Sequence, residues 1–188
     1  MRKTRLLAMT VALFMLTGCS GESSDNVMGD IRSDFQNAEN IQFSANILAD
    51  YGERVFTYGV RFQSAADGGT ITITDPASIA GTTVTIQNGG ATLGFDGAQV
   101  FTGEIMPDGL SPVDAVPMLV DMWREGLITE TVRERYGDED CIAALFRVSD
   151  DVNMRTWFSE SAALPLHAEV YFDGYTVLQF DFTNVIAE

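Results

Sequence analysis

Residues 41–51 read IQFSANILADY, and their apolar side chains fall on every second position. Because successive side chains of a β-strand point to opposite faces, this spacing predicts a strand with one face toward a core or cavity and the other toward water. The apolar face of this strand carries Ile41, Phe43, Ala45, Ile47, Ala49 and Tyr51.

The same alternation recurs in three segments further along the chain. They are carried by Phe56, Tyr58, Val60 and Phe62, by Ile71 and Ile73 between threonines, and by Val84 and Ile86. Turn signals separate them at Asp67-Gly68-Gly69, Asn88-Gly89-Gly90 and Asp96-Gly97. Glycine after Asp or Asn favours tight hairpins, so this part of the chain is predicted to form an antiparallel meander.

Strands resume in the last third of the sequence. They are expected at Thr129–Arg135, Cys141–Val148, Val152–Ser159, Leu166–Phe172 and Thr176–Ile186, with Asp173-Gly174 turning the last hairpin. Roughly eleven strands in all fit a mainly β (α+β) protein with a single large antiparallel curved sheet, an incomplete β-barrel, and not a two-domain protein.

Two helical segments accompany the strands. An amphipathic helix is expected at the start of the folded domain, capped by Asp25 or Asn26. Its apolar residues recur at helical spacing: Val27, Ile31, Phe35 and Ala38. A second helical segment, inserted between Pro107 and Gly126, is expected to cover the concave face of the sheet.

The inserted segment has a clear helix start and a proline inside the predicted helix. Ser111 is a typical helix cap, and Pro112 suits the first helical position. Because proline damages a helix interior, two short pieces are predicted, the second beginning near Pro117. That piece has an apolar face made of Met118, Leu119, Met122 and Trp123.

The first residues have the order of a secretory signal: basic Arg2, Lys3 and Arg5, then an apolar run ending at Leu16. That run is too short to span a bilayer comfortably. The tetrapeptide Leu16-Thr17-Gly18-Cys19 resembles the lipobox of bacterial lipoproteins. The resemblance implies cleavage before Cys19, lipid on its sulfur and attachment to a membrane. We therefore expect a signal peptide at 1–18, a lipidated cysteine and flexible tether at 19–26, and a folded domain at 27–188.

The chain is strongly acidic, with a formal net charge of −16. Without the signal, eight arginines face 27 acidic residues, which gives −19. Such a chain is repelled by nucleic acid and by an anionic membrane face, so neither is expected as an electrostatic partner.

Residues that could support catalysis or metal binding are few. His167 is the single histidine, and it lies on a predicted strand, where a structural role is the ordinary interpretation. Cys141 opens an apolar run and is interpreted as a small buried residue. The acidic groups 138–140 and 150–151 lack the spacing of a calcium loop. We therefore expect no enzyme, no cofactor and no metal site.

What remains is apolar surface on one face of the predicted sheet. Two interpretations stay open: the inserted helical segment covers this face as ordinary core, or the cover is partial and the space accepts an acyl chain. The residues expected to line such a cavity are Phe43, Phe56, Tyr58, Phe62, Phe95, Phe101, Met118, Met122, Trp123, Phe180 and Phe182.

The order of these parts resembles the LolA/LolB-like fold of bacterial lipoprotein carriers. The resemblance rests on a glycine-started strand ending in proline at 69–76, an aspartate-glycine hairpin at 93–101, a central helical segment, and a closing hairpin from Leu164 through Gly174. The acidic composition and the lipobox make the chain most similar to acidic LolA-like lipoproteins of clostridia and other Gram-positive bacteria.

Two functional hypotheses follow. The first is a membrane-anchored module in the cell envelope that binds a lipid, an acyl chain or another apolar ligand. The alternative is a non-enzymatic lipoprotein that localises or stabilises an envelope enzyme, such as one of sporulation or germination, through an edge strand or the outer face of the sheet. Both place the domain on the outer face of the cell membrane, or on the outer membrane of a host that has one.

Overall fold

The structure is a computed structural model, and it describes residues 23–104 and 109–188. The expected signal peptide, the lipidation site Cys19 and the first residues of the expected tether lie outside the described residues. Within those ranges, neither helix is long and apolar enough to cross a bilayer.

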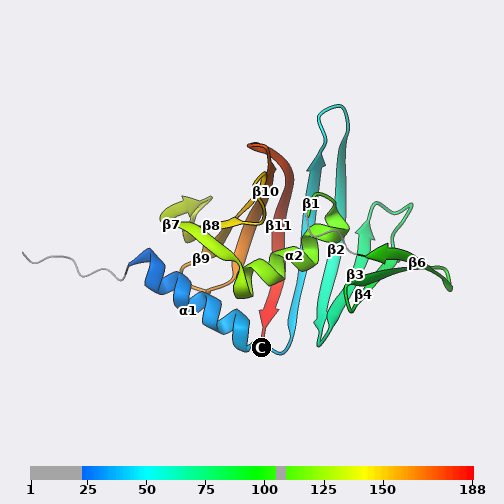
Figure 1. The fold of residues 1–188 in the computed structure, drawn as a ribbon, viewed down its shortest axis with the longest axis horizontal. Helices are drawn as coiled ribbons and strands as arrows, with labels where there is room; N and C mark the ends of the chain where they lie inside the picture. The colour runs from blue at the N-terminus through cyan, green and yellow to red at the C-terminus, as the bar shows by residue number, and fades with distance from the viewer. Residues whose placement is uncertain (1–22, 105–108) are drawn as a thin grey trace, which may run out of the picture.

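The described residues form one open antiparallel sheet of eleven strands with two helices (Figure 1). The strands are β1 (Ile41–Asp50), β2 (Val55–Ala65), β3 (Gly68–Asp75), β4 (Thr83–Gln87), β5 (Gly90–Phe95), β6 (Ala98–Glu104), β7 (Leu127–Tyr136), β8 (Glu139–Arg147), β9 (Val152–Ser159), β10 (Pro165–Phe172) and β11 (Tyr175–Ala187). The predicted fold class is confirmed: the sheet is curved and does not close into a barrel.

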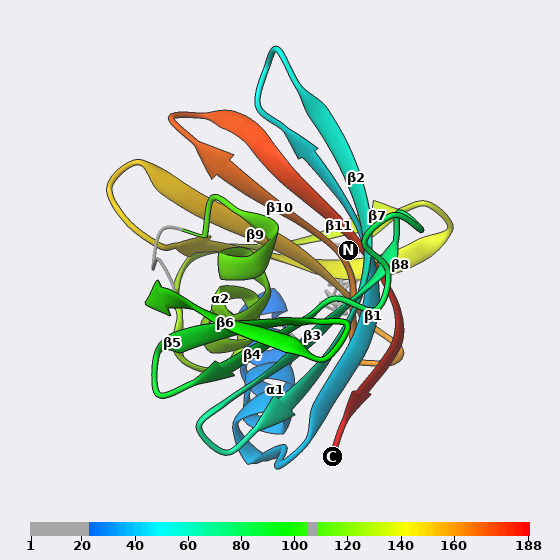
Figure 2. The ribbon, with the colours of Figure 1, turned by 90° about the vertical axis from the view of Figure 1, so that its right-hand side faces the viewer.

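The order across the sheet is β6-β5-β4-β3-β2-β1-β11-β10-β9-β8-β7. Two meanders, β1–β6 and β7–β11, are therefore joined by pairing of the first strand with the last, and β6 and β7 form the two open edges. The helix α2 (Pro112–Glu125) links these edges in sequence. Figure 2 shows the curved sheet wrapping around both helices.

Local sequence explains the register of the sheet. In β1 the odd-numbered residues, from Ile41 to Ala49, are buried, and the even-numbered residues are more exposed. The predicted turns are confirmed where the hairpins reverse: Asn88 and Gly89 have φ of 51° and 75°. Positive φ at both central residues matches a tight two-residue hairpin turn, which Asn-Gly adopts readily.

The helix α1 (Ser24–Asn37) begins slightly earlier than the sequence suggested. Its N-cap is Ser23, whose side chain accepts a hydrogen bond from the Asn26 N–H. The predicted caps, Asp25 and Asn26, are therefore wrong, since both lie inside the first turn. Met28, Ile31 and Phe35 form the buried face of α1.

The predicted break at Pro117 is also wrong, because α2 is one continuous helix from Pro112 to Glu125. Its buried residues include Leu119, Val120 and Trp123. A proline in a helix interior costs about 3 kcal/mol, and burying several large side chains against the sheet offsets that cost. Pro117 still has no N–H to donate to the Val113 carbonyl.

The two helices are fastened together at their carboxyl ends. Arg124 of α2 donates hydrogen bonds to the Phe35 and Ala38 carbonyls of α1, at 3.0 and 2.9 Å. Arg32 of α1 donates to the Gly126 carbonyl at 2.6 Å. Cations at a helix carboxyl end satisfy carbonyls that lack intrahelical donors, so these contacts hold the helices at fixed positions in the concavity.

Candidate functional site

The concave face of the sheet is filled on the side of β8–β11 and β1. Trp123 lies at the centre of this region, with its ring centroid 5.3 to 6.1 Å from those of Phe35, Phe43, Phe158 and Phe182. Its Nε1–H donates to the buried Thr156 hydroxyl at 3.1 Å. Such edge-on aromatic packing leaves this part of the interior filled by the protein's own side chains.

Six of the eleven expected cavity residues belong to this packed core. They are Phe43, Phe62, Met118, Trp123, Phe180 and Phe182, all of which are buried. Met122 is half-buried and packs against the same cluster. These seven side chains pack in the core. Core packing was one of the two open interpretations of this face, and a ligand cavity was the other.

An apolar cleft remains on the other side of α2, between its first residues and strands β2 and β3. The cleft encloses about 160 Å³ and is lined by Tyr58, Val60, Ile71, Ile73, Ser111, Pro112 and Val113. An apolar cavity of about 150 Å³ can hold a benzene molecule. The cleft therefore has room for one ring or for the last few carbons of an alkyl chain.

A row of aromatic rings leads from the β1–β2 end to this cleft. Phe56 lies 6.3 Å from Tyr58 and 6.4 Å from Tyr51, measured between ring centroids. Phe56 is 41% exposed although it shares the face of the buried Val60 and Phe62, because no helix covers it. The row extends the apolar surface outward from the cleft.

Polar groups are confined to the mouth of the cleft. The Tyr51 hydroxyl donates to the Leu110 carbonyl at 3.0 Å, and the Ser111 hydroxyl donates to the Asp114 carboxylate. Burial, helped by Tyr58 and Asp114, raises the pKa of Tyr51. The Tyr51 hydroxyl therefore keeps its proton, and its bond to the segment that leads into α2, to higher pH than an ordinary tyrosine.

Phe95 and Phe101, also expected in the cavity, lie away from the cleft near the β6 edge. Phe95 pairs with Ala98 and shares the concave face with Leu93, where it is largely exposed. Phe101 is 68% exposed and pairs with Thr92, so it points to the outer face. Its ring lies over Gly90, where an added Cβ would come within 3.0 Å of it.

Sequence reasoning missed most of the residues that line the cleft. Val60 and Ile73 were placed on apolar strand faces, but they were not selected as cavity residues. Pro112 and Val113 were treated as a helix start and not as a wall. Their position in the sequence was the useful signal. Pro112 and Val113 form the first turn of the helix that covers the sheet, and the sheet is left uncovered beyond that turn.

A second group of titratable side chains lies on the outer face of the sheet, around His167. The His167 Nδ1 atom is 2.8 Å from Asp181, and Nε2 is 3.7 Å from Glu169. The Tyr136 ring stacks on the imidazole with 4.7 Å between centroids, and its hydroxyl donates to Asp181 at 3.1 Å. Burial and Asp181 raise the pKa of Tyr136 to about 12.

This outer cluster continues through Trp157, which lies 5.2 Å from the His167 ring and donates to Glu134. Arg155 binds the same carboxylate at 2.9 Å. Because Tyr136 ends β7 and reaches residues of β10 and β11, the β7–β8 hairpin curls over the outer face. The cluster holds that hairpin in place, and it contains no serine, threonine or cysteine nucleophile.

Cys141 is buried, as predicted, and burial raises the pKa of its thiol. A thiol in this state is a poor nucleophile, because the reactive species is the thiolate. In the described ranges, no set of three or more His, Cys, Asp or Glu side chains is arranged to hold a metal ion.

Comparison with known proteins gives structural neighbours without sequence relatives: no family model and no curated protein sequence matches the chain. A LolA superfamily protein from Nitrosomonas europaea superposes with a TM-score of 0.50 at 12% identity, over 89% of this chain and 94% of that one. The chain has a LolA-like fold. A LolA-like domain of this kind was expected from the order of its parts.

A second structure, an uncharacterized conserved protein from Thermus thermophilus, superposes with a TM-score of 0.52 at 11% identity, over 88% of both chains. At such identities the likeness shows the LolA-like fold alone. The expected closeness to clostridial and other Gram-positive lipoproteins stays a prediction.

Proposed function

We propose that this chain is a lipid-anchored protein of the cell envelope whose LolA-like domain binds a lipid, an acyl chain or another apolar ligand. The observation that carries the proposal is the apolar cleft between Ile73 and Val113, left open where α2 begins. The LolA-like fold supports it, since a curved sheet with helices in its concavity offers such a space in its opening. No catalytic step is part of the proposal.

The size of the cleft limits how the ligand is held. About six carbons fit, and burying each methylene contributes about 0.8 kcal/mol, so the cleft alone supplies about 5 kcal/mol. Part of that is lost to ordering on binding. A longer chain must therefore lie along the exposed aromatic row of Tyr51, Phe56 and Tyr58, or α2 must move outward.

The proposed anchor sets where the domain works. Cys19 stands five positions before Ser24, the first residue of α1. A chain spans at most about 3.6 Å per residue, so lipid on Cys19 keeps α1 within about 18 Å of the bilayer surface. Figure 1 shows α1 at one end of the molecule and β6 at the other, so the uncovered strands lie far from the attachment point.

Ligand binding is tested with the fluorescence of N-phenylnaphthylamine and with mass spectra of lipids that copurify with the protein. Ile73→Trp fills the cleft and should abolish binding of the dye. Phe101→Ala, which removes an exposed ring from the outer face, is the matched control and should leave dye binding unchanged. A wild-type protein that takes up neither dye nor lipid refutes the proposal.

The anchor is tested separately by Cys19→Ser. The variant should leave the membrane fraction of cells and lose metabolic labelling with palmitate, because one to three acyl chains supply the membrane affinity. A variant that remains in the membrane fraction after a high-salt wash contradicts the proposed attachment.

One observation favours the second candidate function, partner binding by strand addition. β6 is an edge strand, and Val100 and Phe101 on it are both largely exposed. Because Asp96 and Gly97 form a two-residue turn, Phe95 and Ala98 exchange hydrogen bonds, and the Gln99 N–H points away from β5. That edge is open to a strand from an envelope protein.

Gln99→Pro tests this candidate. Proline has no N–H, so the variant loses a donor on the open edge of β6 but no hydrogen bond between β6 and β5. A partner captured by chemical crosslinking on cells expressing the lipidated wild type should be lost with this variant. Capture that is unaffected by Gln99→Pro excludes pairing at β6.

A further inference from the structure

We infer that the cleft selects ligands by charge: its occupant is an amphiphile with an apolar chain and a cationic head group. The inference rests on the proposed function and adds the class of ligand to it. The apolar chain enters between Ile73 and Val113, and the head stays at the mouth, beside Asp114 in the first turn of α2. The head-group preference follows from the charges around the cleft.

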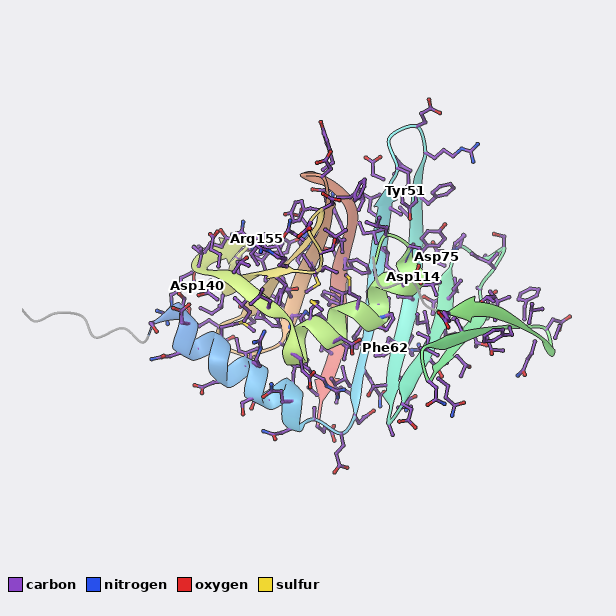
Figure 3. All side chains as sticks on the ribbon, in the orientation of Figure 1. Tyr51, Phe62, Asp75, Asp114, Asp140 and Arg155 are labelled. Carbon is purple, nitrogen blue, oxygen red and sulfur yellow. The ribbon has the colours of Figure 1, made fainter. Side chains whose placement is uncertain are left out.

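One carboxylate follows directly on the residues that line the cleft. Asp114 follows Val113 in the first turn of α2, and it is half-buried with Ser111 as a hydrogen-bond donor. Figure 3 labels it over the beginning of α2. Asp75, at the end of β3, pairs with Gly59 across an irregularity of the β2–β3 ladder and shares the outer face with it, so Asp75 points away from the cleft. A cationic head at the mouth therefore meets negative charge on the α2 wall.

Basic side chains are directed elsewhere. None of the residues that line the cleft is basic. Arg61 follows Val60 but points to the opposite face of β2 by alternation. Arg54 stands in the β1–β2 turn, four residues beyond Tyr58, which is about 13 Å along the strand. An anionic head group would find no arginine within direct reach in this part of the described structure.

The amino end of α2 could be expected to attract an anion, because helix N-termini carry partial positive charge. Here the chain itself occupies that position. The Ser111 side chain accepts from the Asp114 N–H, Pro112 has no N–H, and the Asp114 carboxylate adds a full negative charge to the first turn.

The arginines elsewhere in the described residues are largely engaged. Arg133 binds Glu160 at 2.9 Å and Arg155 binds Glu134 at 2.9 Å, both on the β7–β9 side. Arg32 and Arg124 bind carbonyls at the far ends of the helices. In the open half, residues 41–104 carry six acidic side chains against two arginines, so the field there is negative and attracts cationic amphiphiles at low ionic strength.

The test compares hexyltrimethylammonium with hexyl sulfate, two probes with one chain and opposite heads, below their micelle concentrations. The protein is the mature chain with Cys19→Ser, which keeps every helix and strand and carries no acyl chain of its own. Calorimetry measures the affinities, and methyl NMR shifts of Ile73 and Val113 locate the bound chain. We expect the cation to bind about fivefold more tightly at low salt, the preference that one nearby charge supplies in water.

Asp114→Asn should narrow that preference, and added salt should do the same. Asp75→Asn, on the outer face of β3, should change it less than Asp114→Asn does. In Asp114→Asn the new amide oxygen can still accept from the Ser111 hydroxyl, so the helix start is retained. Asp140→Asn is the matched control: it removes one negative charge at an exposed position on β8, at the other end of the molecule (Figure 3), and should leave the preference unchanged.

Each outcome of this comparison supports or overturns the charge inference. Equal binding of the two probes, with shifts at Ile73 and Val113, overturns the charge inference and leaves the proposed function standing. Tighter binding of hexyl sulfate overturns it in favour of an anion at the α2 amino end. Absence of binding and of methyl shifts with both probes overturns the proposed function as well.

Discussion

The two halves of the sheet share the same alternation of apolar and polar residues, but their faces are covered differently. On the β8–β11 side, the concave face is filled by Trp123 and its neighbouring rings, and the outer face is covered by the cluster around His167. On the β2–β6 side, the concave face is open beyond the start of α2. Its outer face is a row of cross-strand threonines: Thr70, Thr72, Thr83, Thr85 and Thr92.

This difference shows that coverage, and not the strand sequence, separates core from binding surface. Phe62 and Phe56 lie on one face of the same strand, yet the first is buried and the second is exposed. The difference arises because α2 covers Phe62 and stops short of Phe56. A buried large side chain stabilises the fold by about 2 kcal/mol, whereas an exposed one in a row with an open cleft is available to a ligand.

The largest effect is expected at the centre of the closed half. Trp123→Ala should lower the free energy of unfolding by about 3–5 kcal/mol, because it leaves a cavity among four aromatic rings and an unpaired Thr156 hydroxyl. Urea unfolding followed by circular dichroism measures it. Trp123→Phe, which keeps a ring there, should cost less. A loss below about 1 kcal/mol for Trp123→Ala would show that the closed half is not tightly packed.

A smaller loss is expected on the outer face of the same half. His167→Ala should destabilise the fold by about 1–3 kcal/mol, since it removes a buried ring that stacks on Tyr136 and packs against Trp157. A double-mutant cycle with Tyr136→Phe isolates the coupling between the two stacked rings. Additive effects in that cycle would mean that Tyr136 and His167 do not hold the β7–β8 hairpin together.

The fold could be predicted because its signals are local. Alternation along 41–51 and glycine turns such as Asn88-Gly89 fix strands and hairpins within a few residues of sequence. The continuity of α2 could not be predicted in the same way. The cost of Pro117 is visible locally, but the burial of Leu119 and Trp123 that offsets it depends on strands far away in sequence.

The candidate site was predictable in part. Tyr58 was selected, but Ile73 and Val113 were not, because the cleft depends on where α2 ends over the sheet. The face of Phe101 was within reach of the sequence. A two-residue turn at Asp96-Gly97 pairs Phe95 with Ala98, so Val100 and not Phe101 shares the concave face.

Alkaline pH should lower the stability of the fold through the tyrosines of the closed half. The pKa of Tyr136 is raised to about 12, mainly by burial and then by Asp181, while an unfolded tyrosine titrates near 10. Folded-state protonation therefore contributes stability that is complete below about pH 10 and is lost as the pH rises through about 12. Tyr171, whose pKa is also raised, adds a loss of the same sign.

Tyr136→Phe tests this assignment. Because phenylalanine does not titrate, the fall in the free energy of unfolding between about pH 10 and pH 12 should be shallower in the variant than in the wild type. Urea unfolding at several pH values measures the slopes. Identical slopes would mean that the outer cluster does not shield Tyr136.

The smallest effect on stability is expected in the open half, and it completes the comparison. Phe56→Ala should change the free energy of unfolding by no more than about 0.5 kcal/mol, because the ring is exposed and supports no core residue. The same change should weaken binding of an alkyl probe, since a chain that leaves the cleft loses contact with the aromatic row. Phe43→Ala, at a buried ring of comparable size, should show the reverse: about 3–5 kcal/mol of lost stability. If Phe56→Ala destabilised the fold as much as Phe43→Ala, the aromatic row would be core, and the open half would be closed in solution.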